Sequence, residues 1–246
     1  MTHLFAAELL KLRTIRTSWG FGLAVIGFAG LLAAGHIGSP DEGGRLAPDY
    51  QFELFLNAAF PAIVLALLLG ILLFTNEFRH GTISRTLLTT PRRPVLVGVK
   101  VLAGAAAGLG LAVLAVATTV VVAVIWLPLV DVPLEVGDAY GAVWRGLFAA
   151  VLIGALGAAV GGVVHSQVGA LVGTLVWLFV AEPIVAVLLG LIHVRGVADY
   201  FPGATVLGIA NTGQGLSYAG NAGMAVVWIA VASALAVLRT SRRDIT

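Results

Sequence analysis

Six long apolar blocks constrain this chain more than any other feature of its sequence. Each is long enough for a helix to cross the roughly 30 Å of a bilayer's hydrocarbon, which takes about 18 residues or more. Only 11% of the 246 residues are charged, whereas soluble domains carry about 25%. We therefore expect an all-α polytopic membrane protein in which residues 1–246 form one transmembrane domain. The expected spans are roughly Trp19 to His36, Leu54 to Thr75, Val99 to Leu127, Val143 to Val164, Gly169 to Ile192 and Ala219 to Leu238.

The distribution of Lys and Arg predicts how the chain is oriented. An even number of spans puts both termini on one side, together with the loop over residues 76–100. That side holds eleven Lys and Arg residues, and the other side holds only Arg45, Arg145 and Arg195. Because positive residues are retained on the cytoplasmic side, we expect both termini in the cytoplasm and the protein in the plasma membrane.

Residues 1–18 have the pattern of an amphipathic helix lying in the membrane interface. Their apolar and polar positions alternate at helical spacings, although a purely basic topology signal would also be rich in Lys and Arg. The apolar positions are Phe5, Leu9, Leu12 and Trp19, and the polar ones are Glu8, Lys11, Arg13 and Arg16.

The loop over residues 76–100 predicts a helix end, a turn and a second, short helix. Gly81 suits the left-handed conformation that ends a helix, Thr82 can cap the next helix, and Pro91 stops it. The basic side chains of this loop fit lipid phosphates and a partner protein equally well. They are Arg79, Arg85, Arg92 and Arg93.

Residues 193–220 lie outside by this topology but are unusually apolar for a loop. Turn signals occur at Pro202-Gly203 and at Asn211-Thr212-Gly213. We expect a short re-entrant or surface helix pair there.

The residues of most catalytic chemistries are missing. The chain has no cysteine, no Gly-x-Ser-x-Gly nucleophile motif, no pair of histidines four residues apart, and no phosphate-binding loop around its two lysines, Lys11 and Lys100. We therefore expect no enzyme activity, no cofactor and no metal in this chain. The net charge of +2 comes from the cytoplasmic clusters and gives no reason to expect nucleic-acid binding.

Glu182 is expected to be the one ionisable residue deep in a span, and Pro183 follows it. An acid at that depth must face the bundle interior, a partner helix or water, or be protonated. Proline removes a backbone hydrogen bond, so the helix should kink or break there. Glu182 is then either a cap for the kink or a functional acid that contacts substrate, moves protons or takes part in opening.

Glycines four residues apart allow close helix packing at three places. The pairs are Gly104 with Gly108, Gly157 with Gly161, and Gly169 with Gly173, and we expect one of them to mark a subunit interface.

The segment from Asn76 to Lys100 resembles the one after the second span of bacterial type-2 ABC exporter permeases. In that family Glu, then Arg, then Gly-Thr introduces a short cytoplasmic coupling helix, and here Glu77, Arg79, Gly81 and Thr82 match. The basic amphipathic N-terminus and the six spans are similar as well. So is the fifth span, with Trp177 and Glu182-Pro183 followed by Tyr200-Phe201-Pro202.

The resemblance implies a transport subunit that relies on separate partners. It implies a dimer with itself or a sister permease, and a cytoplasmic ABC ATPase that binds the ATP and Mg. The coupling residues would relay ATPase closure to the spans, and an export substrate of unspecified class would cross between them. The implied coupling residues are Glu77, Arg79, Gly81, Thr82, Arg85, Arg92 and Arg93. The small size is similar to that of drug and peptide antibiotic efflux systems in Gram-positive bacteria.

An ion-coupled secondary transporter with Glu182 as its proton site is the alternative. The expected absence of a second buried ionisable residue argues against it, as does the segment over residues 76–100.

Overall fold

The computed structural model describes residues 2–39, 49–81, 92–134, 136–164, 166–194, 196–210 and 216–241. Every regular element within these ranges is helical, as the sequence predicts. Between α1 (Thr2–Thr14) and α2 (Arg16–Gly38), Ile15 is extended, and the Trp19 indole donates a hydrogen bond to the Arg13 carbonyl (2.9 Å). The remaining α-helices are α3 (Tyr50–Arg79), α5 (Arg93–Trp126), α6 (Val136–Val163), α7 (Gln167–Val176), α8 (Glu182–Leu191), α9 (Pro202–Ala210) and α10 (Tyr218–Ser241). Within the described ranges there are also the 3-10 helices η2 (Leu127–Val130) and η4 (Ala198–Tyr200) and the π-helix η3 (Trp177–Ala181).

Six segments of the described ranges are helices long and apolar enough to cross a membrane, in agreement with the expected number. They are Arg16–Gly38, Tyr50–Arg79, Arg93–Val130, Ala139–Val163, Gln167–Leu191 and Tyr218–Ser241. In hydrocarbon a backbone has no water to bond, so a continuous helix satisfies its own donors and acceptors. The second and third spans are longer than expected because α3 continues past Thr75 to Arg79 and α5 already starts at Arg93.

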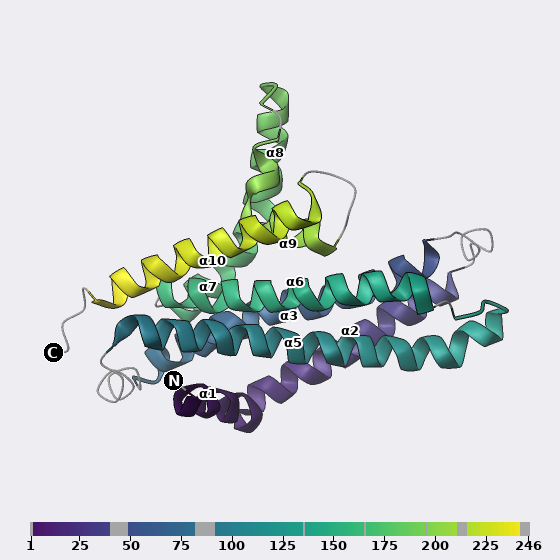
Figure 1. Ribbon diagram of the computed structural model, residues 1–246, viewed down its shortest axis with the longest axis horizontal. Helices are drawn as coiled ribbons and strands as arrows, with labels where there is room; N and C mark the ends of the chain where they lie inside the picture. The colour runs from purple at the N-terminus through teal and green to yellow at the C-terminus, as the bar shows by residue number, and fades with distance from the viewer. Residues whose placement is uncertain are drawn as a thin grey trace.

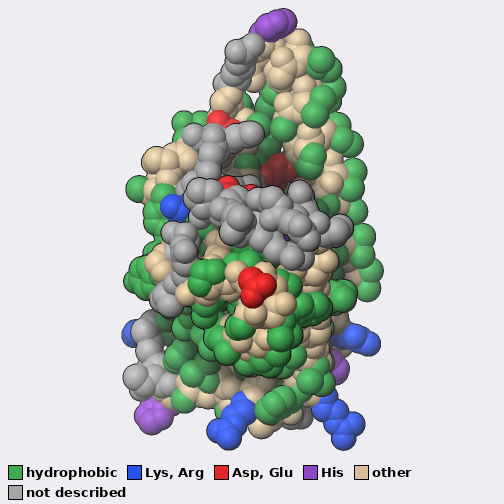
Figure 2. Space-filling view, turned by 90° about the vertical axis from the view of Figure 1, so that its right-hand side faces the viewer, with side chains coloured by type: hydrophobic (Ala, Val, Ile, Leu, Met, Phe, Trp, Pro, Cys, Tyr) green, Lys and Arg blue, Asp and Glu red, His purple; other side chains and the backbone are tan. Residues whose placement is uncertain are grey.

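The helices form a bundle around α3 and α6, whose apolar segments are the most buried (Figure 1). Helices α2 and α5 pack on α3, α5 and α10 also pack on α6, and α1 lies across one end of the bundle. That same end holds the end of α3, the start of α5 and the end of α10. Seen from the opposite end, hydrophobic side chains cover most of the visible described surface (Figure 2). These features fit a multi-pass membrane protein, and the side of the membrane on which each end lies stays a prediction.

Glycines bring α5 and α6 into backbone contact. A Cβ atom added at Gly108 would overlap the carbonyl oxygen of Ala150, and one at Gly104 would overlap that of Gly154. The predicted pair Gly104 and Gly108 therefore packs two helices of the same chain together.

The other two glycine pairs differ from each other. Gly157 and Gly161 on α6 lie against the backbone of α3 in the same close manner. Gly173 has nothing within 4 Å, and the atoms nearest to a Cβ at Gly169 belong to Ser166 and Val164, three and five residues earlier in the chain. Two of the three pairs thus pack within the chain, and a role for the third at a subunit interface stays a prediction.

The fifth span, α7–η3–α8, is the least covered of the six spans in the described ranges. Only 6% of its most apolar 18 residues are buried, against 72% in α3, and Figure 1 shows α8 extending away from the bundle. Its exposed apolar side chains include Val172, Val176, Phe179, Ile184, Val187 and Leu191.

The segment that follows, over residues 193–220, contains η4 and α9. Helix α9 packs on α6 and α10 and lies beside the middle of α6 rather than beyond its end (Figure 1). The Trp228 indole on α10 donates a hydrogen bond to the Tyr200 carbonyl (2.8 Å), which joins η4 to α10. Whether this segment re-enters the membrane stays a prediction.

Candidate functional site

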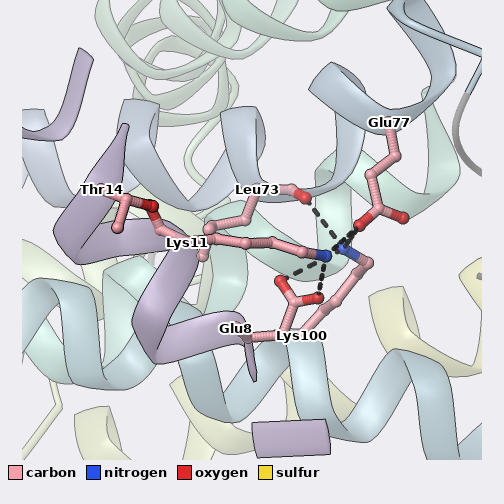
Figure 3. Close-up of polar contacts among 6 residues, drawn as sticks. All are labelled: Glu8, Lys11, Thr14, Leu73, Glu77 and Lys100. Carbon is pink, nitrogen blue, oxygen red and sulfur yellow. Dashed lines mark hydrogen bonds and ion pairs between the residues drawn. The ribbon is translucent and has the colours of Figure 1, made fainter. Parts of the chain in front are cut away.

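Four charged side chains from three helices meet near the end of the bundle crossed by α1 (Figure 3). Glu8 and Lys11 come from α1, Glu77 from α3 and Lys100 from α5, and we call these four residues the ionic cluster. The Lys11 Nζ lies 2.6 Å from Glu8 Oε1 and 2.8 Å from Glu77 Oε1. The Lys100 Nζ lies 2.8 Å from Glu77 Oε1 and 3.5 Å from Glu8 Oε2. Each acid therefore contacts both lysines.

Burial makes these ion pairs stronger and also more costly to break. The Lys100 side chain is 0% exposed, and those of Glu8 and Glu77 are 6% and 10% exposed. The Lys100 Nζ donates a third hydrogen bond, to the Leu73 carbonyl (3.0 Å), and lies 5.3 Å from the centroid of the Phe74 ring. Two positive and two negative charges cancel, which is the condition under which charges are tolerated away from water.

Lys11 is the most exposed member of the ionic cluster, with 44% of its side chain accessible. Partial burial is the largest single influence on its pKa and acts to lower it. Hydrogen bonds to Glu77 and Glu8 and the charges of both acids together outweigh that effect, so the pKa of Lys11 is raised above its ordinary value. Lys11 therefore stays charged throughout the physiological pH range.

The ionic cluster corrects the expectation that the spans hold no second buried ionisable residue besides Glu182. Lys100 is wholly buried in the third span, and Glu77 is buried in the second. The sequence interpretation assigned both to the loop because charged residues commonly mark the ends of spans. Here the charges pair with one another, so the helices continue through them.

Helix α1 turns a polar side toward the bundle. Glu8 is 5% exposed, whereas Leu9 and Leu10 are 38% and 60% exposed. A signal for this arrangement was present in the sequence, since Glu8 and Lys11 are three residues apart and share one helix face. The outward apolar residues suit a helix at the membrane interface, and the interfacial location of residues 1–18 stays a prediction.

The residues predicted for ATPase coupling have different surroundings. Arg79 on α3 donates a hydrogen bond to the Gln167 side chain on α7 (3.2 Å), and Arg93 on α5 donates one to the Thr240 carbonyl on α10 (3.2 Å). Gly81 adopts the left-handed conformation with φ 64°, and Arg92 directly precedes α5. Thr82 and Arg85 lie outside the described residues. Of the predicted set, only Glu77 belongs to the ionic cluster.

Glu182 lies at the start of α8 and is 5% exposed. Its Oε1 accepts a hydrogen bond from the Ala204 amide (2.7 Å), and its Oε2 accepts one from the Gly203 amide (3.2 Å). These are the first amides of α9, which have no carbonyl partner within their own helix. The carboxylate therefore caps a different helix from the one expected.

The break expected at Pro183 takes the form of a π-helical turn. Residues Trp177–Ala181 form η3, and the Glu182 amide donates to the Trp177 carbonyl five residues earlier. After this wider turn α8 begins, and Pro183 lies in its first turn. Amides in the first turn of a helix have no partner within that helix, so the missing amide of proline costs no hydrogen bond there. The Glu182 side chain is then available for α9.

Comparison of the sequence with protein-family models and with curated proteins finds no match. Within the described ranges, no three His, Asp or Glu residues are grouped so that they could hold a metal ion.

Proposed function

We propose that this chain is the membrane subunit of an ATP-driven exporter of the type-2 ABC permease class. The observation that carries the proposal is the sequence over residues 76–100, with Glu77, Arg79, Gly81 and Thr82 at the family's positions. The subunit would form the translocation path as a dimer, with itself or a sister permease. A separate cytoplasmic ABC ATPase would bind and hydrolyse the ATP.

The ionic cluster gives this proposal a mechanical basis. The coupling segment joins the end of α3 to the start of α5, and Glu77 and Lys100 lie on those two helices. Through Glu8 and Lys11 the ionic cluster ties α1 to both helices. A push on the coupling segment by the ATPase would therefore move α1, α3 and α5 as one unit.

Ion-coupled secondary transport is the second candidate, and the buried charges favour it. Ionisable residues inside spans commonly mark proton pathways, and the described spans contain Glu77, Lys100 and Glu182. The net neutrality and mutual pairing of the ionic cluster instead favour a structural role.

Transport by inverted membrane vesicles that contain the chain and its cognate ATPase separates the two functions. The exporter requires ATP, is blocked by vanadate and continues when a protonophore abolishes the proton gradient. The charge reversal Arg85→Glu is expected to reduce ATPase binding and ATPase stimulation while membrane insertion stays normal, because it reverses a charge in the predicted coupling helix.

Arg45→Glu is the matched control, since Arg45 belongs to a loop on the side of the membrane predicted to face away from the ATPase. Transport that persists without ATP and stops with the protonophore would refute the proposal. So would undiminished ATPase binding, stimulation and transport in the Arg85→Glu variant.

A further inference from the structure

A cavity of about 300 Å³ lies beside Glu182, between the fifth span and the bundle. Its walls come from α3, α6, η3, α8, η4 and α9. The volume is at the lower end of the range that holds small organic ligands. Nearly all the side chains that line it are apolar, so it is suited to a molecule with a large hydrophobic part.

The charged side chains of the cavity have one sign. Glu182 and Asp199 line it, and no Lys, Arg or His is among the described residues that do so. Their negative charge attracts a cation and repels an anion. A neutral occupant would gain no charge–charge attraction from either carboxylate.

Aromatic rings on three different elements reinforce this preference. Phe60 on α3, Phe179 in η3 and Phe201 before α9 all line the cavity. The faces of aromatic rings attract cations, and this attraction is strongest where water is excluded. Rings together with carboxylates are the groups that bind an organic ammonium ion.

Hydrogen bonds at this wall favour the ionised form of Glu182, while its burial disfavours that form. The amides of Gly203 and Ala204 stabilise the carboxylate from one side, as does the positive end of the α9 helix dipole. Each oxygen accepts a hydrogen bond from one of these amides, and the Trp177 side chain donates a third to the carboxylate, which has about four acceptor positions. Glu182 can therefore keep its bonds to α9 and still pair with a ligand.

We propose that this cavity is the binding site for a lipophilic organic cation, with Glu182 as the counter-ion and the three phenylalanines around the apolar part. The inference deepens the proposed function by naming the substrate class of the transport path. It concerns binding alone and needs no ATPase.

Binding is tested by calorimetry on the full chain in nanodiscs of zwitterionic lipid, with empty nanodiscs subtracted. One probe is a phenylbutyl-trimethylammonium ion, and the other is its uncharged isostere, in which carbon replaces nitrogen. We expect the cation to bind about tenfold more tightly than the isostere, and Glu182→Gln to reduce that preference, because Asp199 and the three rings remain. Glu53→Gln is the matched control, because Glu53 is an exposed acid that does not line the cavity, and it should keep the preference.

A second variant keeps the test decisive if Glu182→Gln misfolds. Ala186 lines the cavity, and Ala186→Phe should fill part of it and weaken binding of both probes while leaving Glu182 in place. Equal binding of cation and isostere, a preference that Glu182→Gln leaves undiminished, or full binding in Ala186→Phe would overturn the inference. Cation binding by a chain that never engages an ATPase would instead refute only the proposed function.

Discussion

At the residue scale, Lys100 contributes one of the two positive charges that balance the two buried acids of the ionic cluster. It is the only fully buried member, and it contacts Glu8, Glu77 and the Leu73 carbonyl at once. Removing one partner of a buried ion pair leaves an uncompensated charge, which costs about 3–5 kcal/mol. Replacing both partners of such a pair by neutral groups costs far less. Comparing the loss of stability in a variant that lacks one partner with the loss in a variant that lacks both therefore measures how much the pairing stabilises the fold.

Lys100→Met is expected to lower the free energy of unfolding by about 3–5 kcal/mol, because Lys11 alone then faces both acids. The double variant Lys100→Met/Glu77→Gln restores charge balance between Lys11 and Glu8, so it should be more stable than the single one. The measurement is the thermal unfolding of detergent-solubilised protein. Arg13→Met, which removes an exposed positive charge from α1, is the control and should change stability by less than about 0.5 kcal/mol. Additive losses in the double variant would show that Lys100 and Glu77 are not coupled.

The sequence made part of this site predictable. Glu77 was identified from its family pattern, and Glu182 from its position within an apolar run. Glu8, Lys11 and Lys100 were not identified as site residues, because pairing between α1, α3 and α5 depends on how these helices cross. Lys100 did carry a signal, since apolar residues precede and follow it in the run from Val95 to Leu102.

At the element scale, the glycines of α5 determine how closely that helix approaches α6. Gly108 leaves no room for a methyl group, because its added Cβ would overlap the Ala150 carbonyl. Gly110, two residues further on, has nothing within 4 Å. The same substitution should therefore have opposite effects at the two positions.

Gly108→Ala is expected to destabilise the bundle by about 1–3 kcal/mol, since α5 must move away from α6. Gly110→Ala should be neutral or slightly stabilising, because alanine favours the helix over glycine by up to about 1 kcal/mol. The two variants are compared by their purified yield, their monodispersity and their thermal unfolding. A Gly108→Ala variant as stable as Gly110→Ala would mean that α5 and α6 do not pack at this distance.

At the scale of the whole molecule, the spans were predictable and their arrangement was not. The number of spans follows from the lengths of the apolar runs, which the bilayer thickness imposes on the sequence. Which spans are central depends instead on contacts between helices. The spans Tyr50–Arg79 and Arg93–Val130 are equally apolar, yet 72% of the first and only 22% of the second is buried in its apolar window, so apolar character alone does not identify the central helix.

The expected orientation of the bundle in the membrane rests on the even number of spans and on the basic residues at the helix ends. The end crossed by α1 also holds Arg79, Arg93 and Arg239 at the ends of α3, α5 and α10, so it should face the cytoplasm. Ser39 follows α2 at the opposite end, and Leu134 precedes α6 there. The chain has no cysteine, so single cysteines can be introduced without a background.

A membrane-impermeant thiol reagent applied to intact cells tests this orientation. We expect it to label Ser39→Cys and Leu134→Cys and to leave His80→Cys and Ser241→Cys unlabelled, because the membrane shields the cytoplasmic end. All four positions are exposed, so a difference in labelling reports the side of the membrane rather than burial within the protein. Labelling after the cells are opened is the control and should modify all four. Modification of His80→Cys in sealed cells would invert the orientation and place the predicted coupling segment where no cytoplasmic ATPase could reach it.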